Sequence, residues 1–297
     1  MSGAVFTTRA AQALGHAFEV ATPDRDLTDY LGDLFSGLPP GSPDPPHHYE
    51  LSGPDAADRW RLSRDGLPIL EEGTPAHAVA TLLWRINLGV IEDTDDLVLL
   101  HAGAVDLAGV RVLLPGDTEV GKSTLVTGLM RAGAGYFGDE VVGLDLDTNA
   151  MHGYAKPVSL DAGSWPLFSD LEPQVVDHLR PFVGVQWHVQ PRAIPGVEVM
   201  SRARPDLVVL PSFRAHAPTQ VEPVRAATAL GMLAACAFKT SITREQRLVR
   251  LARLVEQTPC FQLTYGTLAA GVDAVRALAR AVARSDPDLG GGGGDVG

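Results

Sequence analysis

One stretch of the chain has residue types and a spacing suited to binding phosphate. Residues 116–124 read Gly-Asp-Thr-Glu-Val-Gly-Lys-Ser-Thr and fit G-x-x-x-x-G-K-[ST], the phosphate-binding loop of nucleoside triphosphate enzymes. Gly116 allows the turn, and Gly121 lets backbone N–H groups approach phosphate oxygens closely. We therefore expect the whole stretch to bind a nucleotide, namely Gly116, Asp117, Thr118, Glu119, Val120, Gly121, Lys122, Ser123 and Thr124.

The polar side chains of this stretch differ in their chemistry. Lys122 can reach the β- and γ-phosphates, and the hydroxyl of Ser123 can hold a magnesium ion. Residues 110–114 before the loop read as a strand, and residues 125–130 after it read as the apolar face of a helix, whose N-terminus adds a partial positive charge. Glu119 would repel phosphates unless it points outward. The pattern predicts a site for ATP and Mg²⁺.

Two acidic candidates follow the loop. Phosphoryl transfer needs a metal and a group that orients or deprotonates the acceptor. Asp139 and Glu140 follow Gly138 and precede an apolar strand at 141–144. Asp145 ends the run Val-Val-Gly-Leu-Asp like a Walker B strand, but a turn role beside Asp147-Thr-Asn149 fits it better.

Composition limits the class of protein. The chain has 297 residues with 45% apolar residues, enough for one large domain or two small ones. The formal net charge is −12 and no Lys/Arg block occurs, which argues against a nucleic-acid partner. The apolar runs are too short for a membrane span, and the first residues do not resemble a secretory signal. The two cysteines, Cys236 and Cys260, have no metal-ligand spacing, so we expect them to be small buried residues in a reducing cytoplasm.

The pattern along the chain predicts three regions. Residues 1–46 read as an appendage with a helix at about 24–35 and a Pro-rich linker at 38–46. Residues 47–284 read as the main domain, and residues 285–297 as a disordered Gly-rich tail. Within the domain, strands at 48–51, 59–62 and 67–70 form a meander, and Thr74 caps a helix that runs to about Val90.

The remaining elements predict a mixed α/β fold. Strands are expected at 97–102, 110–114, 206–210 and 260–264, with a hairpin of 141–144 and 151–154. Helices are expected at 225–238, 243–256 and 268–283. Strands outnumber those of an alternating βαβ pattern, which favours a mixed sheet with helices packed mainly on one side.

The segment 99–145 resembles the HPr kinase/phosphorylase family and its HPr-kinase-like relatives. The likeness rests on Leu100-His-Ala-Gly103, the loop 116–124, Ala132-Gly133 and Tyr136-Phe-Gly-Asp-Glu-Val141, in the family's order and spacing. More weakly it extends from about Tyr49 to about Leu278 and does not cover the first 46 residues.

This resemblance implies a phosphoenolpyruvate-carboxykinase-like P-loop fold and an ATP-dependent kinase activity. It makes Asp139 the base toward the acceptor hydroxyl and places Glu140 near the metal with Ser123. It also places His101 beside the phosphate loop, so Asp139, His101, Lys122 and Glu140 are the expected catalytic residues. HPr kinases assemble as hexamers, so a homo-oligomer is expected by analogy.

Two departures bear on the acceptor. Thr124 stands where members that act on HPr carry Glu, and the Arg-Gly-Leu-Gly-Ile-like segment of those members is missing. The expected acceptor is therefore a hydroxyl of a peptide, a protein or a small molecule. The alternative is an ATP-binding regulatory or scaffold module with weak or no phosphotransfer. Outside the motif, Lys156 could contact the γ-phosphate or a substrate, but an exposed lysine is the commoner explanation. His47-His48 reads as solvent-facing with no third metal ligand nearby.

Overall fold

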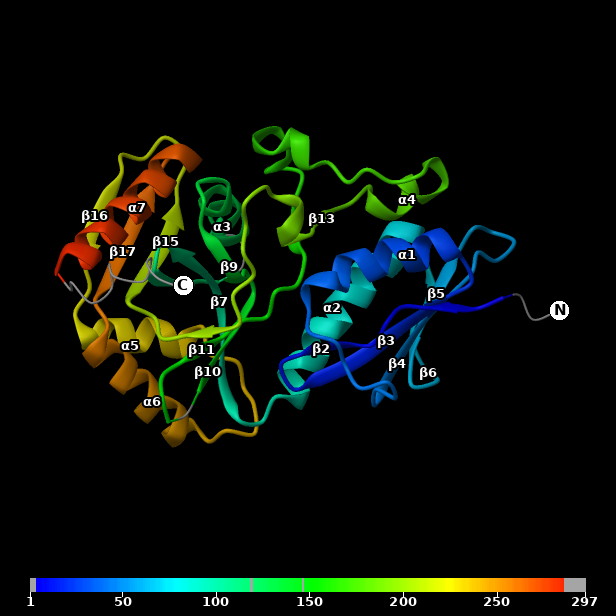
Figure 1. The fold of residues 1–297 in the computed structure, drawn as a ribbon, viewed down its shortest axis with the longest axis horizontal. Helices are drawn as coiled ribbons and strands as arrows, with labels where there is room; N and C mark the ends of the chain where they lie inside the picture. Colours follow the sequence, from blue (N-terminus) through cyan, green and yellow to red (C-terminus); the bar gives the residue numbers. More distant parts are fainter. Residues whose placement is uncertain (1–3, 118–119, 146, 286–297) are drawn as a thin grey trace, which may run out of the picture. The chain divides into compact units, whose positions relative to one another are not determined.

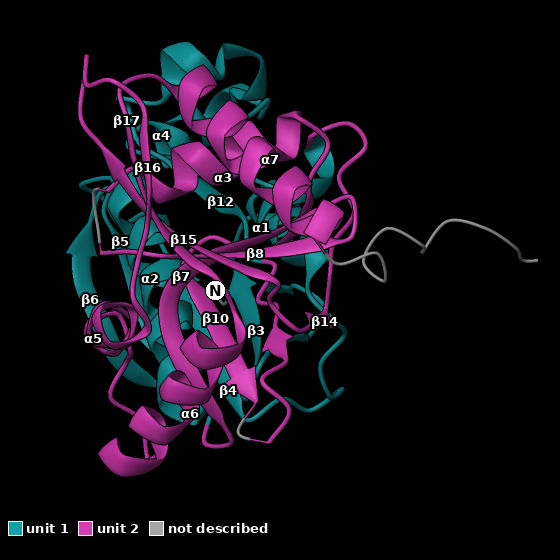
Figure 2. Cartoon of the chain, turned by 90° about the vertical axis from the view of Figure 1, so that its left-hand side faces the viewer, with its two compact units in different colours: residues 1–94, 156–193 teal, residues 95–155, 194–297 magenta. Residues whose placement is uncertain are grey.

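The structure, a computed structural model, describes residues 4–117, 120–145 and 147–285. The chain divides into two compact units, shown in Figure 2. Unit 1 comprises residues 1–94 and 156–193, and unit 2 comprises residues 95–155 and 194–297.

Unit 1 is built on a mixed sheet in the order β1-β3-β4-β5-β6, with β2 paired to β3. Its longer helices contact this sheet: α1 meets β1 and β3, and α2 meets β3, β5 and β6 (Figure 1). The elements are β1 (Phe6–Thr7), β2 (Ala11–Ala13), β3 (His16–Thr22), α1 (Arg25–Leu34), β4 (His47–Ser52), β5 (Trp60–Arg64), β6 (Leu67–Gly73) and α2 (Pro75–Asp93). The meander β4–β6 and the Thr74 cap, which accepts from the backbone N–H of His77, agree with the sequence.

The later segment of unit 1 adds a second, smaller layer of structure. It contains the strand pair β12 (Val158–Leu160) and β13 (Trp187–Val189), the short helix α4 (Arg180–Val183) and several 3₁₀ turns. Phe182 of α4 packs against Trp60 of β5 with ring centroids 5.0 Å apart. This contact joins residues on either side of a long excursion of the chain through unit 2.

The expected boundary at residue 46 differs from this division. β3 pairs in parallel with β4, with Val20 opposite Tyr49, and α1 is the crossover helix between the two strands. Phe18 and Val20 are fully buried. The alternation in His16–Thr22 is masked by its alanines, so the strand was missed, whereas the helix at 24–35 is found as α1 with Asp24 as its N-cap.

Unit 2 carries a larger mixed sheet in the order β14-β11-β10-β7-β8-β15-β17-β16, with β9 paired to β7. β8, β15 and β17 are parallel, and the other pairings are antiparallel. The elements are β7 (Leu97–Leu107), β8 (Val110–Pro115), α3 (Lys122–Arg131), β9 (Gly135–Gly138), β10 (Val141–Asp145), β11 (Met151–His152), β14 (Arg202–Ala203), β15 (Leu207–Phe213), β16 (Gln220–Pro223), α5 (Ala226–Ala235), α6 (Arg244–Gln257), β17 (Cys260–Tyr265) and α7 (Leu268–Ser285).

Helices cover both faces of this sheet, which corrects the expectation that they lie mainly on one side. Successive side chains of a strand point to opposite faces. Leu100 and Ala102 of β7 pack in one core cluster with Leu233 of α5 and Leu254 of α6. A Cβ on Gly103, the next residue along β7, would lie 2.7 Å from Val126 of α3, so α3 covers the other face. In Figure 1, α3 and α7 accordingly lie on one side of the sheet and α5 and α6 on the other. The sheet face that a helix covers depends on the direction of its crossover connection, which the sequence pattern does not show.

Among the described residues, no helix is both long and apolar enough to cross a membrane.

The integration of residues 1–46 into unit 1 can be tested with two valine variants. Val20→Asp places a carboxylate in a fully buried site and should destabilise unit 1 by about 3 kcal/mol or more. Val5→Asp, at a side chain that is 58% exposed, should leave stability unchanged. Thermal melting and amide hydrogen exchange of β4 measure both. Equal protection of β4 in the two variants would mean that the segment is a separate appendage.

Candidate nucleotide site

The loop that leads from β8 to α3 is held by the conformation of Gly121. This residue has φ of +83° and forms the N-cap of α3. A Cβ added there would lie 3.1 Å from Oη of Tyr265 and 3.2 Å from Cβ of Phe213. Glycine is therefore required both by backbone conformation and by space. Thr118 and Glu119 lie outside the described residues, so the orientation expected for Glu119 stays a prediction.

Lys122, the first residue of α3, carries a buried ammonium group. Its side chain is held under the loop, where Nζ donates to the carbonyl oxygens of Gly116 at 2.9 Å and Asp117 at 3.3 Å. Burial lowers the pKa of Lys122, while the charges of Asp139 and Glu140 act in the opposite direction. The two acids that follow β9 in sequence are thus electrostatic partners of the loop lysine.

His101 completes the surroundings of this ammonium group. Nζ of Lys122 lies 3.0 Å from Nε2 of His101, which accepts when the neutral imidazole carries its proton on Nδ1. Burial and the charge of Lys122 both lower the pKa of His101, which favours the neutral ring. The backbone of His101 accepts from the N–H of Gly116 at 3.2 Å and donates to the carbonyl of Cys236 at 2.8 Å. The histidine is therefore fixed between the loop and the end of α5.

Asp139 lies in the turn between β9 and β10 and is only 2% exposed. Oη of Tyr136, itself fully buried, donates to Oδ1 of Asp139 at 3.0 Å. Burial raises the pKa of Tyr136 well above its usual value, so the phenol keeps its proton and acts as the donor. The carbonyl of Glu140 accepts from the N–H of Ala102 at 3.2 Å, which ties the acidic pair to β7 beside His101.

The four residues predicted as catalytic are therefore brought together in unit 2. His101, Lys122, Asp139 and Glu140 interact electrostatically with one another, although they come from three separate elements or turns. Ser123 and Thr124 lie in the first turn of α3 and are partly buried.

Two aromatic residues lie beside the loop that the sequence did not predict as part of the site. Phe213 ends β15 and Tyr265 ends β17, and their ring centroids are 5.6 Å apart. Both strands run parallel to β8, so their carboxyl ends lie at the same edge as the loop, where open α/β sheets bind ligands. Phe213 is 46% exposed despite its size. The signal in the sequence was their position at the end of two apolar strands.

The structure also shows where Asp145, Lys156 and the two cysteines lie. Asp145 occupies the turn role, because its Oδ1 accepts from the backbone N–H of Thr148 at 2.8 Å and Asp147 at 2.9 Å. Lys156 was expected to be exposed but is buried in unit 1, where Nζ donates to the carbonyl of Pro157 at 3.1 Å. Cys260 is buried as expected, and Cys236 is only partly buried.

Comparison with known proteins finds a distant structural likeness and no match at the level of sequence families. No protein-family model matches the chain. No curated protein matches it either. A solved structure of the Hpr(Ser) kinase/phosphatase from Coxiella burnetii aligns with 63% of this chain and 97% of its own, at 13% identity and a TM-score of 0.31. A likeness of this degree is distant and assigns neither a fold family nor a function.

The turn role of Asp145 predicts a stability defect without a binding defect. Backbone hydrogen bonds, from Thr148 above all, lower the pKa of Asp145 from 3.8 to about 2. The carboxylate therefore stabilises the fold above pH 4, and this contribution is lost as pH falls from about 4 to 2. Asp145→Ala should lower stability by about 1 kcal/mol at pH 7 and remove this part of the acid dependence. Denaturant melts across pH measure it, and a tenfold loss of ATP affinity would instead indicate a metal ligand.

Proposed function

We propose that the protein is an ATP-dependent kinase that transfers the γ-phosphoryl group to a hydroxyl. The observation that carries this proposal is the buried ammonium of Lys122. It lies at the start of a helix, under a glycine loop, next to one histidine and two carboxylates. The buried carboxylate of Asp139 beside the loop and the lysine supplies the group that would accept a proton from the acceptor hydroxyl, which nucleotide binding alone does not require.

The loop region fits a nucleotide. The first backbone N–H groups of an α-helix have no intrahelical acceptors and form an anion site together with the helix dipole. Here they belong to α3, whose N-cap is the left-handed Gly121. Lys122 would contact the β- and γ-phosphates. Ser123 and Glu140 offer the oxygen ligands that Mg²⁺ prefers, and the bound ion would neutralise phosphate charge.

Asp139 would act as the base in the proposed reaction. The acceptor oxygen forms a bond to the γ-phosphorus, the bond between that phosphorus and the β–γ bridging oxygen breaks, and Asp139 takes the hydroxyl proton. Tyr136 holds one carboxylate oxygen by its hydrogen bond. His101 keeps the ammonium of Lys122 in place without adding a charge. Each group thus has one role that its surroundings permit.

The acceptor is a hydroxyl of a peptide, a protein or a small molecule. The net charge of −12 disfavours an anionic polymer as substrate. The missing segment typical of members that act on HPr argues for a different acceptor. Mass spectrometry of a cell extract treated with the protein and γ-labelled ATP distinguishes protein products from small-molecule products.

The kinase proposal is tested by separating binding from chemistry. Lys122→Ala should abolish ATP binding, because it removes the cation that faces the phosphates. Asp139→Asn should keep or raise ATP affinity, since it removes a negative charge nearby, while phosphotransfer falls at least about 100-fold. Calorimetry with ATP and the labelled-ATP assay give the two readouts.

Asp147→Asn, a neutralised carboxylate on an exposed turn, is the matched control and should change neither readout. Undiminished product formation by Asp139→Asn would remove Asp139 as the base. ATP binding by the wild-type protein without any labelled product would favour the regulatory-module alternative.

The hydrogen bond from Tyr136 to Asp139 gives a finer test of positioning. Tyr136→Phe removes only the hydroxyl from a fully buried ring, so the fold should persist with a loss of about 1 kcal/mol. If Tyr136 orients the base, kcat should fall roughly tenfold while the ATP KM stays constant. A matched change, Tyr265→Phe, removes a buried hydroxyl beside Gly121 that takes no part in the Tyr136–Asp139 hydrogen bond, and should leave kcat unchanged. Equal kcat in Tyr136→Phe and wild type would make the bond purely structural.

A further inference from the structure

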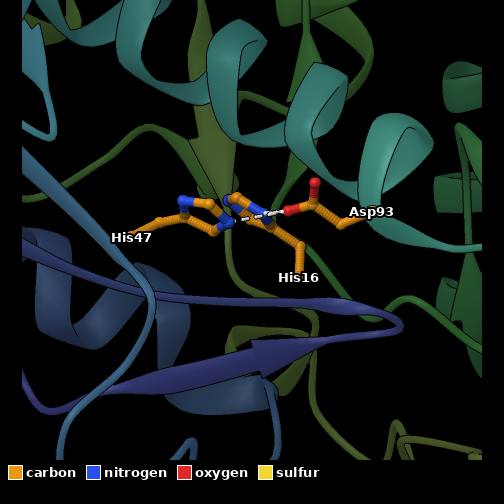
Figure 3. A group of neighbouring side chains, drawn as sticks. All are labelled: His16, His47 and Asp93. Carbon is orange, nitrogen blue, oxygen red and sulfur yellow. Dashed lines mark hydrogen bonds and ion pairs between the residues drawn. The ribbon is translucent and has the colours of Figure 1, made fainter.

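A second group of titratable side chains lies in unit 1, outside the nucleotide site. His16 begins β3, His47 begins β4 and Asp93 ends α2. Figure 3 shows the two imidazole rings side by side with ring nitrogens directed at the Asp93 carboxylate. The expectation that His47 faces solvent is therefore wrong, because its side chain is only 19% exposed. Asp93, the carboxylate that its ring meets, is distant from it in the sequence.

The three side chains offer converging ligand atoms. Oδ2 of Asp93 lies 2.6 Å from Nδ1 of His16 and 2.9 Å from Nε2 of His47. All three atoms lie within 4.8 Å of one another. Ligands of a tetrahedral zinc ion are about 3.3 Å apart when bonds are about 2.0 Å, so the two separations would widen by about 0.7 and 0.4 Å to admit the ion. Two imidazoles and one carboxylate are a ligand set that zinc accepts.

We propose that His16, His47 and Asp93 bind a Zn²⁺ ion that ties β3, β4 and the end of α2 together. Three protein ligands leave the fourth position to water.

The free nitrogens of both imidazoles have outer partners of the kind that orient metal ligands. Nε2 of His16 lies 3.2 Å from Oη of Tyr49, which in turn donates to the carbonyl of Arg85 at 3.3 Å. Nδ1 of His47 lies 3.1 Å from Oδ2 of Asp65. Metal-bound histidines typically donate their second ring N–H to a carboxylate, a carbonyl or water. With Nδ1 of His16 and Nε2 of His47 on the ion, both remaining N–H groups have an acceptor.

The backbone around His16 is shaped to hold its ring. A Cβ on Gly89 of α2 would lie 2.5 Å from Cε1 of His16, so a glycine is needed where the helix passes the imidazole. A Cβ on Gly15 would lie 2.3 Å from the carbonyl oxygen of Asp93, and the N–H of Gly15 donates to Oγ1 of Thr94 at 3.0 Å. The approach of the strand to the helix end is fixed independently of the side chains that would bind the ion.

The local charge also favours a cation, although Arg64 competes with it. Its Nη2 lies 3.1 Å from Nδ1 and 3.3 Å from Nε2 of His47, and 3.8 Å from Oδ2 of Asp93. This nitrogen would have to withdraw from His47 when the ion binds. The same guanidinium also pairs with Asp65 and Glu92, both at 3.5 Å. With neutral imidazoles, three carboxylates and one guanidinium leave a local charge of −2. A divalent ion balances this charge while Arg64 keeps its bonds to the outer two carboxylates.

A second group with metal-ligand spacing provides a comparison. Asp24, Asp26 and His178 also lie close together, but Asp26 and His178 are exposed. Exposed ligands bind weakly because the ions and the side chains are well hydrated. His178 therefore serves as a control for adventitious zinc binding.

The experiment is a zinc titration of the full-length protein after treatment with a chelator. Competition with a chromogenic chelator gives stoichiometry and affinity, and thermal melting gives a second readout that does not depend on activity. We expect about one tightly bound Zn²⁺ per chain and a higher Tm in its presence. Co²⁺ in place of Zn²⁺ should give the visible absorption of a tetrahedral N/O site.

The test uses variants at partly exposed residues, because a substitution of the buried His16 could unfold the protein. His47→Gln should weaken zinc binding more than tenfold, and Asp65→Asn should weaken it about 10- to 100-fold as an outer partner. His48→Gln, the adjacent histidine that pairs with Glu19, and His178→Gln should leave affinity unchanged. Absence of tight zinc, or zinc binding that is lost with His178→Gln and kept with His47→Gln, would overturn the proposal.

Discussion

The buried ammonium of Lys122 is the interaction on which the candidate nucleotide site depends. A desolvated cation is costly unless several groups share its charge, and here two carbonyls, one imidazole and two carboxylates do so. These groups come from β7, the glycine loop and the β9–β10 turn. The sheet order places β7 between β10 and β8, so all of them meet at one edge. The fold of unit 2 is thus the condition under which this lysine can be buried.

The site residues could be predicted to a large extent because they follow one another closely in sequence. The glycine loop has its own spacing signature, and Asp139 and Glu140 follow one helix and one strand later. Phe213 and Tyr265 could not be predicted in the same way. They reach the loop only through the parallel pairing of β15 and β17 with β8, which is a tertiary property. The same holds for Asp93, whose meeting with His16 depends on how α2 crosses β3.

The fold could be predicted from the sequence where local signals are strong, and the prediction was wrong where they are weak. Capping by Thr74 marked one helix start correctly, the helix at about 24–35 was found as α1, and the hairpin of β10 and β11 was visible from its turn. In β3 the residues at both faces are largely buried, so its sequence carries little period-2 signal, and its burial reflects pairing with β4. Helix placement on both sheet faces likewise depends on crossover direction rather than on composition.

The discontinuity of unit 1 has a consequence for how the chain acquires its structure. Synthesis delivers residues 1–94 well before residues 156–193, yet Trp60 needs Phe182 to cover it. During synthesis, the first sheet therefore has an incomplete core until the intervening residues of unit 2 have left the ribosome. Unit 1 can complete its fold only after residues 156–193 have been made. A truncation or a stall inside unit 2 would leave residues 1–94 partly folded and accessible to proteases or chaperones.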